Sequence, residues 1–153
     1  MAGERISGSI DGQLDACFEA MHRIDGIYDA YARHVGVSPT RLMILDYLFD
    51  HDGASQHAIC DYLKLPRQTV NNVVAACAQE GLVRLDADPG DRRVRTVRFT
   101  DDGARYRDAL ILPLRRAEAR AMGTLGEEDR ERMLNAMGRF VDALDAQIGM
   151  LPA

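Results

Sequence analysis

The sequence predicts a mainly α-helical protein with one small β-hairpin. Near both ends, in residues 10–35 and 127–151, apolar side chains recur at steps of three and four, which is the spacing of helices that pack along one apolar stripe. Between them, residues 82–100 read as strand, turn and strand around Asp-Pro-Gly-Asp, which is typical turn chemistry. The chain has 153 residues, 46% of them apolar, so we expect a single domain, 1–153, with a complete core.

The first predicted helix covers residues 10–35, and the second begins with Ser38 and Pro39. The apolar positions of the first helix repeat like a heptad. They are Leu14, Cys17, Met21, Ile24, Tyr28, Tyr31 and Val35. The second helix is nearly all apolar through Phe49, and Gly53 ends it. We therefore expect the second helix to lie in the core.

A pair of helices follows, starting at Ser55, and its second helix runs from Pro66 to Gln79. One face of that helix is apolar at i, i+3, i+4 and i+7, the pattern of a buried stripe. This stripe consists of Val70, Val73, Val74 and Cys77. The opposite face is polar or small, and there is no acid between Pro66 and Gln79. It consists of Gln68, Asn72 and Gln79, flanked by Thr69, Asn71, Ala75 and Ala76.

That polar face is suited to reading DNA. Asn and Gln amides can bond an adenine edge at two points, Thr can contact a thymine methyl, and small side chains let a helix approach the major groove closely. An acid there would repel phosphate, and none is present. Taken alone, the pattern also fits an ordinary amphipathic surface helix.

The hairpin after Gly81 strengthens the DNA-binding interpretation, because it is rich in arginine. Its arginines are Arg92 and Arg93 at or just past the tip, and Arg84, Arg95 and Arg98 along the arms. A guanidinium at such a tip can enter a narrow minor groove. Asp88 and Asp91 are expected to fix the hairpin by pairing with an arginine, and a salt-bridged surface hairpin is the alternative. A helix pair followed by this hairpin is the layout of a winged helix-turn-helix DNA-binding region, here residues 38–100.

A long helix is predicted to begin at Thr100 and to run through about Met122. Within it, Pro113 removes a backbone donor and should bend the helix. The last helix repeats the heptad spacing after Gly126, at Leu134, Met137, Val141, Leu144, Ile148 and Leu151. We interpret residues 10–35 and 103–150 as dimerisation helices, although both stripes could also pack within a monomer. A homodimer would present two reading helices to a palindrome with half-sites about 10 bp apart.

These segments resemble the MarR family of transcription regulators. The segment DPGDRRVRTVRFTDDG is similar to the family's hairpin signature, and SPTRLMILDYL, QHAICDYLKL and QTVNNVVAACAQEGLV follow in the family's order and spacing, over roughly residues 10–149. The resemblance implies a repressor that reads the bases of its DNA site with Gln68, Thr69, Asn71 and Asn72. It also implies that Arg92 or Arg93 enters the minor groove and that Arg67 contacts phosphate. We add Lys64, Arg84 and Arg95 to the predicted DNA contacts. Pro66 departs from the family's Ser cap, so that capping bond should be lost while the helix survives.

The charge is unevenly distributed. The net charge is −5, but residues 60–100 hold seven cations against five acids, a net of +2, so the remainder carries −7. An acidic body with a basic reading region disfavours random adhesion to DNA. The first residues, MAGERISGS, and the absence of a long apolar run predict no membrane segment and a cytoplasmic protein.

Regulation by a small aromatic or phenolic effector is implied by the resemblance. The expected site lies near Tyr28, Tyr31, Met43 and Tyr47, with Arg33 or Arg41 holding a carboxylate. Residue types alone indicate core positions with a solvated arginine rim.

A second regulatory possibility is a thiol switch at Cys17. The alternative is that Cys17 is an inert cysteine in an apolar stripe, as also expected for Cys60 and Cys77. The histidines have no metal-ligand spacing, so we expect neither a metal nor a cofactor.

The sequence contains none of the short motifs that mark common catalytic or nucleotide-binding sites, and we do not expect an enzyme. A protein-interaction dimer that does not bind DNA is the remaining alternative, but it would leave the amide face and the arginine hairpin without a purpose.

Overall fold

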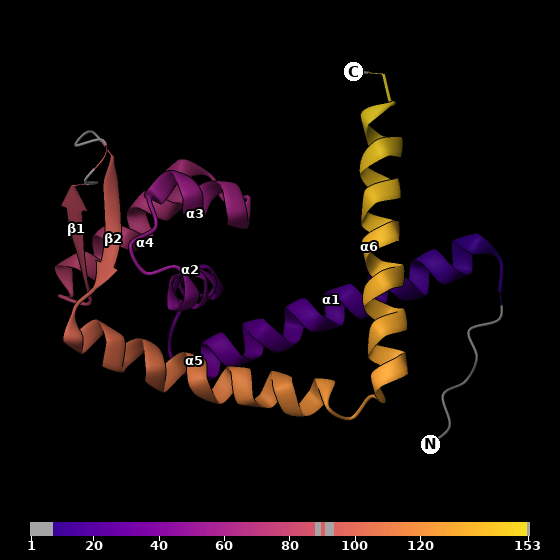
Figure 1. The fold of residues 1–153 in the computed structure, drawn as a ribbon, viewed down its shortest axis with the longest axis horizontal. Helices are drawn as coiled ribbons and strands as arrows, with labels where there is room; N and C mark the ends of the chain where they lie inside the picture. Colours follow the sequence, from indigo (N-terminus) through magenta and orange to yellow (C-terminus); the bar gives the residue numbers. More distant parts are fainter. Residues whose placement is uncertain (1–7, 88–89, 91–93, 153) are drawn as a thin grey trace. The chain divides into compact units, whose positions relative to one another are not determined.

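The computed structural model describes residues 8–87, 90 and 94–152. Figure 1 shows its elements in chain order. They are α1 (Ile10–His34), α2 (Pro39–Asp50), α3 (Gln56–Leu63), α4 (Arg67–Gln79), β1 (Val83–Ala87), β2 (Arg95–Phe99), α5 (Asp101–Met122) and α6 (Glu127–Gly149). The predicted fold class, mainly α with a small β-wing, is confirmed. Contacts divide the chain into two compact units, residues 1–111 and 112–153.

The predicted helix starts coincide with side-chain caps. Ser38 Oγ accepts a hydrogen bond from the Arg41 N–H (3.2 Å), and Ser55 Oγ accepts one from the Ala58 N–H (3.1 Å). Pro66 stands at the N-cap of α4 and supplies no side-chain bond, yet α4 begins at the next residue. Both parts of the Pro66 prediction are therefore confirmed.

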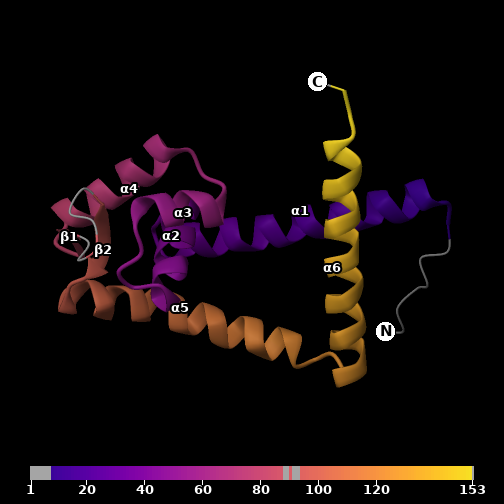
Figure 2. The ribbon, with the colours of Figure 1, turned by 45° about the horizontal axis from the view of Figure 1, so that its top comes forward.

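The core of the first unit lies where α2, α3, α4 and the hairpin meet, a group that Figure 2 shows gathered beyond one end of α1. Its largest fully buried side chains come from five elements: Ile44, Leu45 and Leu48 of α2, Ile59 of α3, Val70 and Val74 of α4, Val97 of β2, and Ile111 of α5. The expectation that α2 is a core helix is thus confirmed. On α4, Val70, Val74 and Cys77 are buried as predicted, whereas Val73 is only half-buried.

The hairpin is anchored on both sides of β2. One edge pairs antiparallel with β1, with Val83 opposite Phe99 and Leu85 opposite Val97. The other edge bonds to the connection between α2 and α3: the Gly53 N–H donates to the Val97 carbonyl (2.8 Å), and the Val97 N–H donates to the Ala54 carbonyl (2.9 Å). Val97 and Phe99 are buried, and β2 lies between β1 on one edge and the α2–α3 connection on the other.

The hairpin base also contacts the start of α5 without intervening side chains. Thr100 Oγ1 donates to the Gly81 carbonyl (2.7 Å) and accepts from the Gly103 N–H (3.0 Å). A Cβ at Gly103 would stand 1.7 Å from the Leu82 carbonyl oxygen, so only glycine permits this approach of the two backbones.

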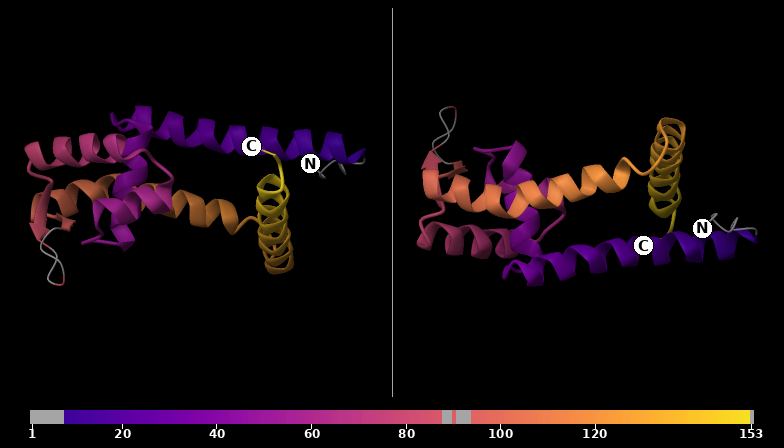
Figure 3. Two further views of the ribbon diagram at one scale, coloured as in Figure 1. Left: turned by 90° about the horizontal axis from the view of Figure 1, so that it is seen from above. Right: turned by 90° about the horizontal axis from the view of Figure 1, so that it is seen from below.

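The terminal helices leave much of their apolar surface uncovered. In α1 only Ala32 is buried, since most of this helix extends beyond the group of α2, α3, α4 and the hairpin (Figure 3). In the second unit, α6 buries none of its residues. The predicted stripe is exposed along α6 and just beyond its end: Leu134, Met137, Val141, Leu144, Ile148 and Leu151. Among the described residues, no helix is long and apolar enough to cross a membrane.

Candidate nucleic-acid interface

The polar face of α4 carries an ordered pair of amides. Gln68, Asn72 and Gln79 are exposed, as predicted. Gln68 Nε2 donates a hydrogen bond of 2.7 Å to Asn72 Oδ1. Because the two residues are one turn apart, this bond orients both side chains on one surface. It leaves the Asn72 amide nitrogen and the Gln68 carbonyl oxygen free to meet a donor–acceptor pattern such as the adenine edge in the major groove.

Thr69 and Asn71 lie at the margins of that face. Both are half-buried, and Asn71 Oδ1 is buried without a hydrogen-bond partner among the described residues. The oxygen of Asn71 is therefore turned away from solvent, and a base contact by this residue would have to use its amide nitrogen. Gln68 and Asn72 are better placed to read bases than Thr69 and Asn71.

Cations flank the start of α4. Lys64 is the C-cap of α3, with a left-handed backbone (φ 53°) that turns the chain toward α4. Lys64, Arg67 and, on β2, Arg95 are exposed, and none of their side chains makes an ion pair within the described part of the chain. A helix N-terminus with nearby cations attracts phosphate, because its free N–H groups and its dipole favour an anion.

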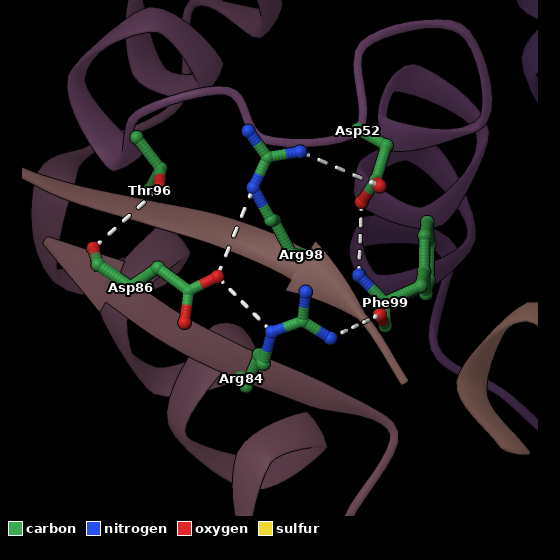
Figure 4. Close-up of polar contacts among 6 residues, drawn as sticks. All are labelled: Asp52, Arg84, Asp86, Thr96, Arg98 and Phe99. Atoms are coloured by element: carbon green, nitrogen blue, oxygen red, sulfur yellow. Dashed lines mark hydrogen bonds and ion pairs between the residues drawn. The ribbon is translucent and has the colours of Figure 1, made fainter. Parts of the chain in front are cut away.

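Two further arginines fix the base of the hairpin (Figure 4). Arg84 Nε bonds Asp86 Oδ2 (3.0 Å), and Arg84 Nη1 donates to the Phe99 carbonyl (3.3 Å). Arg98 lies 3.7 Å from Asp86 and 3.9 Å from Asp52. Asp52 Oδ1 in turn accepts the Phe99 N–H (2.9 Å). We call these residues the wing-anchoring network; it gives Arg84, which is 57% exposed, a structural partner besides its predicted DNA contact.

Part of the predicted hairpin lies outside the described residues. This concerns Arg92 and Arg93, expected to enter the minor groove, and Asp88 and Asp91, expected to pair with an arginine of the hairpin. Their assignments stay predictions. Within the described part, Asp86 and Asp52 hold hairpin arginines, and sequence reasoning missed Asp52 because nothing local to the end of α2 indicates a contact with β2.

The predicted effector residues have separate partners. The Tyr31 hydroxyl donates to the Leu110 carbonyl (2.6 Å), and burial raises its pKa. The Tyr47 ring stacks on His51 with centroids 4.4 Å apart. Arg41 holds a carboxylate, but that carboxylate belongs to Glu80, at 2.6 Å. Tyr28 and Met43 are exposed. The contacts of Tyr31, Tyr47 and Arg41 thus run to different partners rather than to one shared site.

The three cysteines are free. Cys77 is buried, and burial raises the pKa of its thiol, which disfavours the reactive thiolate. Cys17 and Cys60 are half-buried. No group of three or more His, Cys, Asp or Glu side chains that could hold a metal occurs in the described part of the chain.

The α3–α4 pair, the anchored hairpin and the exposed amide face define a winged helix-turn-helix DNA-binding protein. A sequence model of the MarR family matches residues 35–94, which include this region. The chain is 28% identical over 125 residues to the HTH-type transcriptional repressor NicR of Pseudomonas putida, covering 82% of this chain and 79% of NicR. Residues 35–94 thus match the MarR family of transcription regulators, and the chain as a whole is similar to proteins of that kind.

Solved structures share the fold. NMB1585, a MarR family regulator from Neisseria meningitidis, superposes with a TM-score of 0.77 at 22% identity, over 90% of this chain and 96% of that chain. A complex of MepR from S. aureus with DNA gives a TM-score of 0.69, also at 22% identity, over 86% and 97% of the two chains. These similarities extend beyond the region matched by the family model to the terminal helices.

Proposed function

We propose that this regulator is a repressor that binds a palindromic operator as a homodimer and is released by a small-molecule effector. The observation that carries the proposal is the exposed Gln68–Asn72 pair on an acid-free helix. Its free amide nitrogen and carbonyl oxygen offer the donor and acceptor that distinguish base pairs in the major groove. The similarity to NicR, a transcriptional repressor, supports repression rather than activation.

The anchored hairpin and the flanking cations support the same reading. The wing-anchoring network ties the hairpin to Asp52, in the connection between α2 and α3, without using Arg95. Lys64, Arg67 and Arg95 can therefore contact phosphate, while Arg92 and Arg93 are assigned to the minor groove. Phosphate contacts position the protein, and the amides on α4 supply the sequence information.

A second copy of the chain is the proposed occupant of the exposed apolar stripes. The heptad positions of α6 are exposed, and α6 buries no residue. Stripes with this spacing on two helices are the pattern of helices that pack against helices. A two-fold dimer would place two copies of α4 at a palindrome with half-sites about one helical turn apart.

The effector is proposed to be aromatic or phenolic, with contacts to Tyr28, Tyr31, Met43 and Tyr47. An anionic effector that uses Arg41 has to compete with the Glu80 carboxylate, which already bonds both Nη atoms of Arg41. The alternative trigger is oxidation of Cys17, whose half-buried position in α1 places it within the proposed dimer helices.

Fluorescence anisotropy on duplex from upstream of the protein's own gene, against scrambled duplex near physiological salt, tests the proposal. We expect at least about 1000-fold preference for the native duplex and a steep fall of affinity with salt. Equal weak binding to both, together with no enrichment from random-sequence pools, would favour a protein-interaction dimer instead. Adding peroxide to the wild type and to Cys17→Ser separates the two triggers, because only the thiol switch is lost in the variant.

A further inference from the structure

One ion pair joins α2 to the end of the recognition helix α4. Arg41 Nη1 donates to Glu80 Oε1 (2.7 Å), and Arg41 Nη2 donates to Glu80 Oε2 (2.6 Å). Arg41 lies in the first turn of α2, and Glu80 is the C-cap of α4. Two parallel bonds between planar groups fix orientation as well as distance. We call this pair the Arg41–Glu80 clamp.

The clamp is enclosed on the arginine side. The Arg41 side chain is only 16% exposed, against 47% for Glu80. The Arg41 guanidinium also lies 5.4 Å from the centre of the Tyr106 ring of α5, and its Nε is buried without a hydrogen-bond partner in the described part of the chain. A guanidinium so enclosed needs its carboxylate, since an unpaired charge there would be poorly solvated.

The pKa shifts of Arg41 and Glu80 both favour an ion pair. The hydrogen bond to Glu80 raises the pKa of Arg41, against a smaller opposing effect of burial. The same bond lowers the pKa of Glu80. Both shifts favour the charged forms that make the pair.

The other contacts of α4 constrain its orientation less than the two parallel bonds of the clamp do. Its apolar stripe, with Val70, Val74 and Cys77 buried, opposes withdrawal from the core, and the hydrophobic effect behind it has no preferred direction. Its N-cap, Pro66, makes no side-chain hydrogen bond. The clamp adds a directional side-chain contact at the other end of the helix.

We propose that the Arg41–Glu80 clamp sets the orientation of α4 toward DNA, which makes Arg41 and Glu80 positioning residues for sequence specificity although neither lies on the amide face. The proposal rests on the proposed function, because specificity exists only if the protein reads a particular sequence. Misorienting α4 should displace Gln68 and Asn72 from base edges while leaving the flexible cations able to follow the phosphates.

The test compares Arg41→Met, Glu80→Gln and the charge-reversed double variant Arg41→Glu/Glu80→Arg with the wild type. Anisotropy measures affinity for operator and for scrambled duplex, at a temperature where circular dichroism shows each variant folded. Arg105→Met is the matched control: it also removes a cation and an ion pair, but that pair, with Asp102, lies within the first turn of α5. Should Arg41→Met fail to fold, Glu80→Gln carries the test, because Glu80 is half-exposed.

We expect both clamp variants to lose about ten-fold in operator affinity, within the range of residues that act on a site through intervening structure, with scrambled-duplex affinity and the salt slope unchanged. The double variant should recover most of the loss, since a carboxylate in the first turn of α2 and a cation at the end of α4 both suit the helix dipoles. Arg105→Met should match the wild type.

Two outcomes overturn the clamp proposal while the operator proposal stands. One is an unchanged operator preference in the folded clamp variants; the other is equal loss on both duplexes, which would mean that Arg41 acts through charge or general stability. Absence of any operator preference in the wild type itself rejects the proposed function, and the clamp proposal with it.

Discussion

The bond between Gln68 and Asn72 makes a quantitative prediction about base reading. We expect Asn72→Ala to weaken operator binding mainly at one base pair of each half-site. The Asn72 amide nitrogen and the Gln68 carbonyl oxygen together offer a two-point contact to an adenine, which contributes about 1–3 kcal/mol of discrimination, so breaking the pair should cost roughly five- to 150-fold. In addition, Gln68 loses the partner that orients it at 2.7 Å, so part of its own contact should disappear in the same variant.

This shared loss can be measured in a double-mutant cycle of Gln68→Ala, Asn72→Ala and both together. If the two amides act as one unit, the double variant costs less than the sum of the single variants. The difference should exceed about 0.5 kcal/mol, since independent sites add to within that margin. The margin also exceeds the stabilisation of about 0.2–0.5 kcal/mol that such a pair gives a helix by itself.

The assay is anisotropy with the operator and with duplexes that carry single base changes. Gln79→Ala is the control: Gln79 lies on the same face of α4 but at its C-terminal end, whereas recognition helices contact bases mainly through their N-terminal residues. Equal loss for operator and scrambled duplex in Asn72→Ala, or strictly additive losses in the cycle, would refute the paired-amide reasoning.

Three further predictions concern stability. Gly103→Ala should lower the free energy of unfolding by at least about 3 kcal/mol, measured by urea denaturation, because its Cβ would meet the Leu82 carbonyl oxygen at 1.7 Å. Asp52→Ala should cost about 1–3 kcal/mol in the same measurement, because it removes the acceptor of the Phe99 N–H. The hydrogen bond from Arg41 lowers the pKa of Glu80 below its ordinary 4.5; its contribution to stability is therefore present above pH 4.5 and lost as the pH falls through the folded-state pKa, which urea midpoints in acid should show.

Matched variants separate these effects from general damage. Gly26→Ala, where an added Cβ meets nothing within 4 Å, should be neutral or stabilising; a cost equal to that of Gly103→Ala would contradict the close-approach argument. Asp52→Asn keeps an acceptor and should cost less than Asp52→Ala. Glu80→Gln should reduce the loss of stability in acid, and an unchanged acid profile in this variant would mean that other carboxylates dominate it.

Local features of the sequence were sufficient to predict most of the fold. The first two helices were expected at residues 10–35 and from Ser38-Pro39 through Phe49, and they span Ile10–His34 and Pro39–Asp50. Caps, apolar spacing and turn residues act between neighbours along the chain, so they can be read without knowing the tertiary structure. The Gln68–Asn72 bond was within reach as well, because residues four apart on a helix face each other.

Contacts between distant segments were not predictable in the same way. Arg41 was expected to hold an effector carboxylate or, from residue types alone, to lie on a solvated rim, but it is largely enclosed and bonded to a residue 39 positions away. Asp52 contacts Phe99 across 47 positions. Whether a charged side chain is exposed or forms a tertiary contact depends on which elements pack beside it. The apolar pattern of the sequence does not name those neighbours, because they are set only when the whole fold has formed.

These distant pairs also change what the charge count of the reading region means. Two of the three described acids in residues 60–100 pair with an arginine: Glu80 lies 2.6 Å from Arg41, and Asp86 3.0 Å from Arg84. The third, Asp61, lies 3.2 Å from the His57 ring. Acids whose field is offset by a neighbouring cation oppose phosphate less than free acids do. Lys64, Arg67 and Arg95 make no ion pair in the described part of the chain, so their charges remain available to phosphate. The modest net of +2 therefore understates the attraction of this surface for DNA, because Glu80 and Asp86 balance arginines of the scaffold, whereas the three cations that make no ion pair with described residues lie beside the amide helix and on the hairpin.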